Sequence, residues 1–186
     1  SAVSNSRLHS ASPLLLKLDL RDFFVSIPGA RVHAMFRTLG YPQETARYLS
    51  GLSTHNTPAR VLREVPQEEY PSPEEHRHRK EWARQFTGRH LPQGAPTSPA
   101  LANLCAYRLD LRLSGVAREC QARYSRYVDD LVFSCADDDP ARGRRILTMV
   151  QGIILEEGFV PNWRKTLMAP ASTAQRVTGL VVNDSR

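Results

Sequence analysis

The chain has 186 residues, of which 41% are hydrophobic, and its 25 Lys and Arg residues outnumber its 19 Asp and Glu residues. This length suits one domain or a piece of a larger one, and the apolar share is enough for a real core, which excludes disorder for most of the chain. No apolar run approaches the roughly 18 to 20 residues of a membrane span, and residues 1–12 lack the apolar stretch of a secretory signal. We therefore expect a cytoplasmic protein with no membrane partner.

The net charge of +6 comes almost wholly from arginine. The planar guanidinium suits phosphate groups, so this charge favours a polyanionic partner. The three cysteines, Cys105, Cys120 and Cys135, are too widely spaced for a zinc motif and too few for a disulfide framework, so we interpret them as small buried residues.

The first predicted element is a strand over residues 14–20. Leucines at every second position share one face, and the other face carries Leu15, Lys17 and Asp19. Asp22 would point away from Asp19 in such a strand and is left out of the candidate site. Pro28 then opens a predicted helix that Gly40 closes, and a second helix is expected over residues 42–52.

Residues 54–90 change to proline and charge, which indicates an insertion with one solvated helix. His76 and His78 lie in its most charged stretch, residues 74–81, so we interpret them as solvated side chains and not as metal ligands. A loop over residues 91–99 then leads into a helix predicted for residues 100–113.

Two strands are predicted over residues 122–128 and 131–135, with Asp129 and Asp130 alone forming the turn between them. Asp139 is a natural N-cap for a helix that ends near Gly158, and a final strand is expected over residues 176–182. This order of elements predicts an α+β domain in which helices cover one side of an antiparallel sheet.

Adjacent aspartates in a tight turn repel each other, and a divalent cation is the simplest group that would offset this repulsion. Mg²⁺ prefers carboxylate oxygens, and Asp19 on its own strand is the natural third ligand beside Asp129 and Asp130. The alternative is that the pair is only a solvated turn. The acidic run 137–139 is explained by helix capping and is not assigned to metal.

Four segments, in their order along the chain, resemble the palm of reverse transcriptases. They are Lys17-Leu18-Asp19-Leu20-Arg21-Asp22-Phe23-Phe24, then Leu91-Pro92-Gln93-Gly94-Ala95-Pro96-Thr97-Ser98-Pro99-Ala100, then Tyr127-Val128-Asp129-Asp130, and finally Gly158-Phe159 with Lys165. The resemblance covers residues 14–183 apart from the charged insertion. It implies that residues 1–186 form a polymerase palm with partial fingers, as a fragment of a longer chain with fingers before Ser1 and a thumb after Arg186.

The resemblance also implies an RNA-directed DNA polymerase that uses two Mg²⁺ ions, with Asp19, Asp129 and Asp130 as catalytic metal ligands and the Leu20 carbonyl as a further one. Lys165 would neutralise or protonate pyrophosphate, although a lone lysine can also be merely solvated. The partners implied are an RNA template, deoxynucleoside triphosphates and the DNA product.

Phe24 matches the position of the aromatic side chain that excludes a 2′-hydroxyl; Phe23 is assigned to the core, and the alternative that both are core residues stays open. Gln93 and Gly94 would contact the incoming nucleotide. Contacts to primer or template are implied for Tyr127, Pro96 and Ser98, with a capped helix start as the plainer interpretation of the last.

A narrower resemblance is to bacterial retron reverse transcriptases. Val177-Thr178-Gly179 matches a triplet of that group, and Asn5-Ser6-Arg7-Leu8-His9 approximates its Asn-Ala-x-x-His element, with Ser6 in place of alanine. The resemblance implies that these residues recognise a structured noncoding RNA, with Asn5, His9, Val177, Thr178 and Gly179 as candidates. It further implies RNA-linked DNA primed from an internal ribose hydroxyl, often in phage defence with an accessory effector protein.

Three other interpretations stay open. The chain could be a palm-like domain that binds RNA without polymerising, or a reverse transcriptase of a group II intron or a CRISPR system. A viral RNA-dependent RNA polymerase fits less well, because Phe24 would hinder ribonucleotides.

Overall fold

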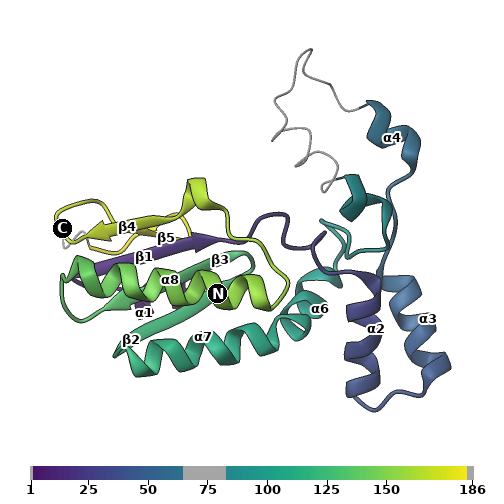
Figure 1. Ribbon diagram of the computed structural model, residues 1–186, viewed down its shortest axis with the longest axis horizontal. Helices are drawn as coiled ribbons and strands as arrows, with labels where there is room; N and C mark the ends of the chain where they lie inside the picture. The colour runs from purple at the N-terminus through teal and green to yellow at the C-terminus, as the bar shows by residue number, and fades with distance from the viewer. Residues whose placement is uncertain (1, 65–82, 184–186) are drawn as a thin grey trace. The chain divides into compact units, whose positions relative to one another are not determined.

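The structure is a computed structural model that describes residues 2–64 and 83–183, and it divides into two compact units (Figure 1). The first unit joins Ser1–Phe23 to Ala106–Arg186, and the second is Phe24–Cys105. The charged stretch 74–81, with His76 and His78, lies outside the described residues. None of the helices described in these ranges combines the length and apolar character that crossing a bilayer requires.

The first unit is built on a four-stranded antiparallel sheet in the order β2-β3-β1-β4. Its strands are β1 (Leu14–Asp19), β2 (Ala122–Tyr127), β3 (Asp130–Cys135) and β4 (Leu167–Pro170). β1 pairs with β3 on one side and with β4 on the other, so it is an inner strand, and the strand predicted for residues 14–20 is confirmed. β4 was not predicted from the sequence.

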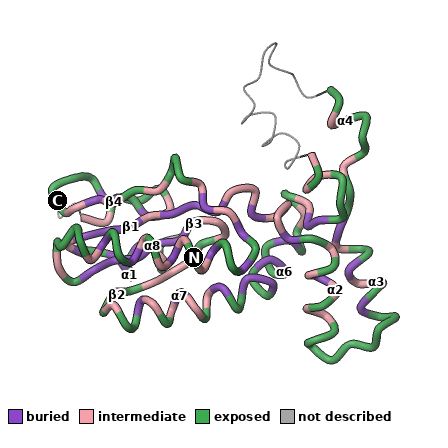
Figure 2. The backbone as a smooth tube through the Cα atoms, viewed as in Figure 1, coloured by how far each residue is buried: buried purple, intermediate pink, exposed green. Residues whose placement is uncertain are grey.

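Helices α7 (Tyr107–Glu119) and α8 (Pro140–Glu156) cover the sheet face that carries the alternating leucines (Figures 1 and 2). Leu14, Leu16 and Leu18 are at most 1% exposed there. Gly143 allows the close approach of α8, because a Cβ at this position would lie 3.0 Å from Leu14 Cδ2 and 2.7 Å from Met168 Sδ. The predicted cap is confirmed, since Asp139 Oδ1 accepts a hydrogen bond from the Ala141 N–H at 2.9 Å.

The opposite face of the sheet is also partly covered, which corrects the prediction of helices on one side only. Val177 packs there with Leu15, Val132 and Ala169 in a buried cluster, and α1 (Ala2–Leu8) lies against β2. Val177 belongs to a hairpin of β5 (Arg176–Val177) and β6 (Leu180–Val181), so the single strand predicted for residues 176–182 is wrong. The reason is the positive φ of Thr178 (48°) and Gly179 (84°), which reverses the chain.

The turn between β2 and β3 lies one residue earlier than predicted. Tyr127 pairs with Asp130, so Val128 and Asp129 are the two central residues and Asp130 is the first residue of β3. Val128, at the first central position, has a positive φ of 59°. A positive φ at the first of two central positions is typical of a type II′ turn, which favours glycine there, so the β-branched Val128 is strained.

The second unit contains α2 (Gly29–Thr38), α3 (Gln43–Ser53), α4 (Ala59–Glu64) and α6 (Ser98–Cys105). The predicted helices at 28–40 and 42–52 correspond to α2 and α3. The single helix predicted for residues 100–113 is instead two helices, α6 and α7, interrupted at Ala106, whose φ of −89° and ψ of 2° are not helical. His55 and His90 exchange backbone hydrogen bonds of 3.0 and 2.9 Å, which join the two ends of the insertion.

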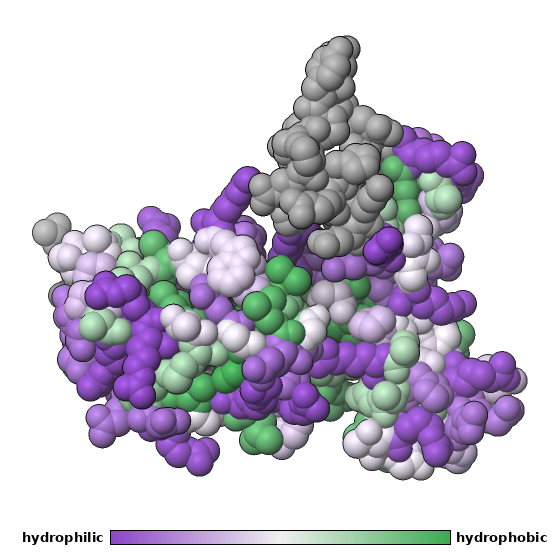
Figure 3. Space-filling view, in the orientation of Figure 1, coloured by the Kyte–Doolittle hydropathy of each residue, from purple (hydrophilic) through white to green (hydrophobic). Residues whose placement is uncertain are grey.

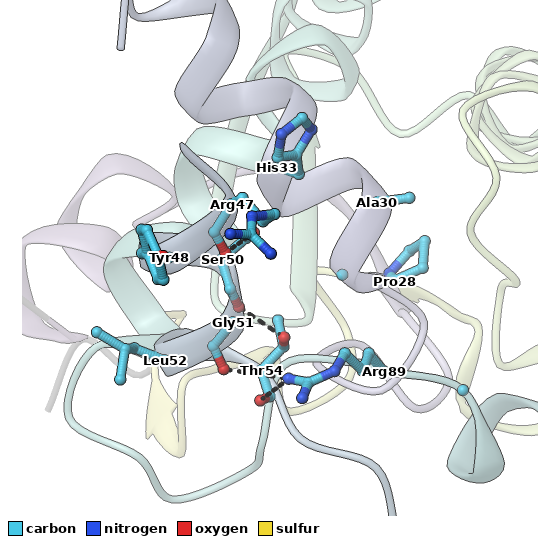
Figure 4. A pocket seen from close by; sticks show the side chains of 12 residues that line it. Pro28, Ala30, His33, Arg47, Tyr48, Ser50, Gly51, Leu52, Thr54 and Arg89 are labelled. Atoms are coloured by element: carbon cyan, nitrogen blue, oxygen red, sulfur yellow. Dashed lines mark hydrogen bonds between the residues drawn. The ribbon is translucent and has the colours of Figure 1, made fainter. Parts of the chain in front are cut away.

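A cavity of about 720 Å³ lies in the second unit beside α2 and α3 (Figure 4). The Arg89 guanidinium donates to the carbonyls of Gly51 and Thr54, both at 3.1 Å, and so ties the end of α3 to the last residues of the insertion. Arg47 stacks over the Tyr48 ring at 4.9 Å on the rim. These contacts stabilise the unit internally.

Candidate active site

Two of the three candidate aspartates lie opposite each other at the ends of the two inner strands, β1 and β3. Asp19, the last residue of β1, pairs with Asp130, the first residue of β3. Directly opposed residues of antiparallel strands place their side chains on the same face, so the two carboxylates are neighbours. This arrangement follows from the alternating sequence of β1, which buries its leucines on one face and leaves Asp19 on the other.

The third aspartate, Asp129, lies in the adjacent turn. Its carbonyl accepts a hydrogen bond from the Leu20 N–H at 2.9 Å, which fixes the turn against the end of β1. The Arg126 guanidinium donates to the Val128 carbonyl at 2.9 Å and holds the other central residue. Asp19, Asp129 and Asp130 thus lie near one another where β1 ends and β3 begins, within the first unit.

Asp19 is nearly buried, at 6% exposed, and two polar side chains hold it. Asn162 donates from Nδ2 to Asp19 Oδ1 at 2.9 Å, and the Asn162 N–H donates to the Asp19 carbonyl at 2.7 Å. The Lys165 ammonium lies 3.2 Å from the same carboxylate. Asn162 directly precedes the short 3₁₀ helix η1 (Trp163–Lys165), which therefore presents both groups to the end of β1.

A second lysine neutralises Asp130. Lys17 Nζ lies 3.1 Å from Asp130 Oδ1, and about a quarter of each side chain is exposed. Lys17 precedes Asp19 by two residues on β1, so both side chains lie on the same face of the sheet. The site thus combines three carboxylates with two ammonium groups.

Local charge and burial shift two ionisation equilibria in this site. Burial, and then the carboxylates of Asp19 and Asp130, raise the pKa of Asp129 above its ordinary value, against the opposing effect of its own backbone hydrogen bond. The hydrogen bond to Asp19 raises the pKa of Lys165, and the charge of the aspartates adds to this effect. The raised pKa of Lys165 reflects the negative charge of the neighbouring aspartates, whereas the raised pKa of Asp129 reflects burial first.

Within residues 2–64 and 83–183, no three acidic, histidine or cysteine side chains are arranged so that they could already hold a metal ion. The donor chemistry nevertheless fits a hard divalent cation, because Asp19, Asp129, Asp130 and the Leu20 carbonyl offer only oxygen ligands. Ammonium groups stand against two of these carboxylates.

The nucleotide-contact candidates belong to the second unit. Gln93 and Gly94 are exposed in the loop before α6, where Gly94 has a φ of 90°, and Pro96 is exposed as well. Phe24 is half-buried. Ser98 is fully buried and donates to the Pro92 carbonyl at 2.6 Å, so its hydroxyl stabilises the loop and does not act as the helix cap of the plainer interpretation.

The flanking residues of the first unit have contrasting environments. Tyr127 ends β2 opposite Asp130 and is 43% exposed, whereas Phe23 is buried as predicted and packs on Phe159 with ring centroids 5.6 Å apart. The Arg126 guanidinium lies 5.5 Å from the centre of the Phe23 ring. Phe23 therefore anchors the chain just beyond Asp19.

The candidate RNA-recognition residues divide into buried and presented groups. His9 is fully buried, with Nδ1 2.8 Å from Ser134 Oγ and Nε2 2.7 Å from Ser125 Oγ, so it joins the end of α1 to β2 and β3. Asn5 Nδ2 is buried and has no hydrogen-bond partner among the described residues. Val177 is buried, while Thr178 and Gly179 form the tip of the β5–β6 hairpin.

Sequence reasoning missed two residues of this site, Asn162 and Lys17. The alternation that placed Asp19 away from the leucines also places Lys17 on its face, so that signal was available. Asn162 carries no periodic signal, because its contact with Asp19 depends on how the chain after α8 returns to β1. The backbone hydrogen bond from the Arg21 N–H to the Val160 carbonyl, at 2.8 Å, belongs to that return.

Comparison with known proteins finds similarity to reverse transcriptases, both in a family model and in individual relatives. Residues 3–182 match the family model described as reverse transcriptase (RNA-dependent DNA polymerase). The chain is 37% identical to the retron Mx162 reverse transcriptase and 39% identical to the retron Mx65 reverse transcriptase, both of Myxococcus xanthus, over 98% and 94% of its length. It is 29% identical to the retron Ec86 reverse transcriptase of Escherichia coli over its whole length. The chain spans 36%, 37% and 48% of these three relatives, respectively.

Proposed function

The chain belongs to the reverse transcriptase family, and from this premise we propose that it is the catalytic part of a retron-type RNA-directed DNA polymerase. The observation that carries the proposal is the pairing of Asp19 with Asp130 on one sheet face, with Asp129 in the adjoining turn. The similarity to three retron reverse transcriptases supports the retron type. In this proposal the first unit is the polymerase palm and the second contributes part of the fingers.

Asp19, Asp129 and Asp130, with the Leu20 carbonyl, would hold two divalent cations, for which Mg²⁺ is our candidate. When bound, such a pair lowers the pKa of the primer 3′-hydroxyl and neutralises charge on the triphosphate. Asn162 keeps Asp19 oriented through its two hydrogen bonds. Lys165, whose side chain is 65% exposed, would neutralise the pyrophosphate leaving group.

The substrate contacts are proposed from the family resemblance and the exposure of the residues. Phe24 would exclude the 2′-hydroxyl of a ribonucleotide, and the exposed Gln93 and Gly94 would contact the incoming deoxynucleotide. Pro96 and Tyr127 are exposed and available to template or primer. Ser98 would act indirectly, by holding the loop through its bond to Pro92.

We propose a structured noncoding RNA as template and partner, with DNA joined to it as the product, and an accessory effector protein as a further partner. Thr178 and Gly179 at the hairpin tip are the candidates for direct contact with that RNA. Asn5, His9 and Val177 would act by positioning α1 and the hairpin, because His9 and Val177 are buried. The three cysteines are free thiols, in keeping with our proposal of a cytoplasmic location.

Primer extension by the purified full-length protein tests the polymerase activity. Asp129→Asn removes one carboxylate charge from the site and should reduce extension by at least about a thousandfold, because the positioned charges supply most of the rate enhancement in such reactions. Asp139→Asn is the matched control, since asparagine also caps helices and Asp139 lies at the start of α8. Equal activity of Asp129→Asn and the wild type would refute the proposal.

The same protein distinguishes the retron type from related classes. Nucleic acid that copurifies with it should be a compact noncoding RNA covalently joined to short DNA. Intron RNA would indicate a group II intron enzyme, and tightly bound RNA without any extension activity would indicate a palm-like binding domain.

A further inference from the structure

The chain uses lysine very sparingly. It contains 22 arginines and only three lysines, Lys17, Lys80 and Lys165. Lys80 lies outside the described residues, and each of the other two contacts a carboxylate of the candidate active site. Lys17 pairs with Asp130 at 3.1 Å and Lys165 with Asp19 at 3.2 Å. Apart from Lys17 and Lys165, every Lys or Arg residue within the ranges 2–64 and 83–183 is an arginine.

Two arginines of the same unit, Arg126 and Arg108, make a different kind of contact. The Arg126 guanidinium binds both oxygens of Asp110, at 2.8 and 2.6 Å, and Arg108 Nε lies within 3.0 Å of both oxygens of Glu157. These pairs tie α7 to β2 and to the residue after α8. A planar guanidinium that binds both carboxylate oxygens holds the carboxylate in one orientation, which suits a permanent structural link.

An ammonium group makes a weaker demand on its partner. It is a compact charge on a flexible stem of four carbons. Lys17 contacts a single oxygen, Asp130 Oδ1, and can leave this carboxylate without breaking a two-point contact, whereas Lys165 lies 3.2 Å from both oxygens of Asp19. Lys17 and Lys165 also remain accessible, with 27% and 65% of their side chains exposed. The Lys17–Asp130 pair is therefore the one-point contact of this site, made by the more easily released type of basic side chain.

We propose that Lys17 is an exchangeable counter-ion of Asp130, which neutralises this carboxylate in the metal-free enzyme and must release it for a divalent cation. This inference rests on the proposed function of the aspartates as metal ligands. It adds that position 17 requires lysine specifically: a neutral residue would strengthen cation binding, and arginine would obstruct it. Lys17 is thus a residue that adjusts cation affinity, not one that contacts the substrate.

The test measures cation binding directly by titrating the metal-free full-length protein with Mn²⁺ and following the free ion by electron paramagnetic resonance. Lys17→Met should bind Mn²⁺ about tenfold more tightly than the wild type, because a unit charge roughly 4 Å from a divalent ion opposes its binding even in water. Lys17→Arg should bind it about tenfold more weakly, since a two-point contact holds Asp130. Arg144→Met, which removes a charge from the exposed surface of α8, is the control and should bind like the wild type.

A purely structural role for Lys17 predicts a different order, in which Lys17→Met weakens Mn²⁺ binding and Lys17→Arg preserves it. That order, or equal affinity of all variants, would overturn the inference. Lys17→Gln replaces Lys17→Met if thermal unfolding shows that the latter is not folded. A wild type that extends a primer but lacks the expected order of affinities refutes this inference alone, whereas a wild type that neither binds Mn²⁺ nor extends a primer refutes the proposed function.

Discussion

Asn162 holds Asp19 at two points, through its side-chain amide to Oδ1 at 2.9 Å and through its backbone N–H to the Asp19 carbonyl at 2.7 Å. The second bond fixes the backbone at the end of β1, and the first fixes the rotation of the carboxylate. The Asp19 carboxylate is almost fully buried. If the Asn162 side chain were removed, this carboxylate could not replace the missing hydrogen bond with one to bulk water.

Asn162→Ala should therefore lower the rate of primer extension by about 10-fold to 100-fold, the size of effect typical for groups that orient metal ligands. Asn183→Ala is a matched control, because Asn183 also donates from its amide to backbone carbonyls, those of Ala171 and Thr173, but at the C-terminal segment. The measurement is the extension rate at saturating nucleotide together with the urea midpoint of each variant. Equal rates for Asn162→Ala and Asn183→Ala would contradict a positioning role for Asn162.

Most of the first unit's architecture could be predicted because its signals are local. The alternation at residues 14–19 fixes which face of β1 is buried, and Asp139 with Pro140 marks the start of α8. The convergence of Asp19 with the hairpin aspartates followed from the same alternation and from the family resemblance. Local pattern and long-range packing agree in these segments.

The sequence-based predictions are wrong or incomplete where an unusual backbone conformation or a long-range contact determines the structure. The β2–β3 turn is displaced by one residue, and its central residues are held by Leu20 and Arg126, which lie outside it. The hairpin at residues 176–181 depends on positive φ at a threonine, which composition does not indicate. Asn162 was missed because its partner is 143 residues away in the sequence.

Substitution of Val128 tests whether the turn beside the candidate metal ligands is strained. Its φ of 59° costs a β-branched residue of order 1–3 kcal/mol, and asparagine tolerates this conformation better. Val128→Asn should therefore raise the free energy of unfolding by about 1 kcal/mol in urea titrations, whereas Val128→Ala keeps a Cβ and most of the strain. A lower stability for Val128→Asn than for Val128→Ala would show that the turn is not strained in solution.

Substitution of Phe24 tests whether this residue makes the enzyme select deoxynucleotides over ribonucleotides. If its ring excludes the 2′-hydroxyl, Phe24→Val should increase the incorporation of ribonucleotides relative to deoxynucleotides by at least about tenfold, since relief of a steric clash in a pocket changes selectivity by roughly this factor or more. Phe23→Val is a matched comparison, because Phe23 is buried against Phe159 and its loss should lower stability without changing selectivity. Unchanged sugar selectivity in Phe24→Val would remove the assignment.

The pH dependence of stability tests the buried hydrogen bonds through which His9 links α1 to the sheet. Burial, followed by the charge of Arg123, lowers the pKa of His9 from 6.5 to about 4, so its ring is neutral at pH 7 and bonded to Ser134 and Ser125. Between pH 6.5 and about 4 the unfolded chain binds a proton that the folded chain does not. Stability must therefore fall as the pH falls through this range, by at most about 3 kcal/mol from this residue, and remain unaffected by it above pH 6.5.

The corresponding experiment compares urea unfolding of the wild type and His9→Gln at pH 7.5 and pH 4.5. The variant should be the less stable protein at pH 7.5, because it loses part of the link to the two serines. The difference should shrink or reverse at pH 4.5, since glutamine takes up no proton on unfolding. A difference that stays constant between the two pH values would show that His9 does not stay neutral in the folded protein, and the buried link would have to be assigned to a protonated ring.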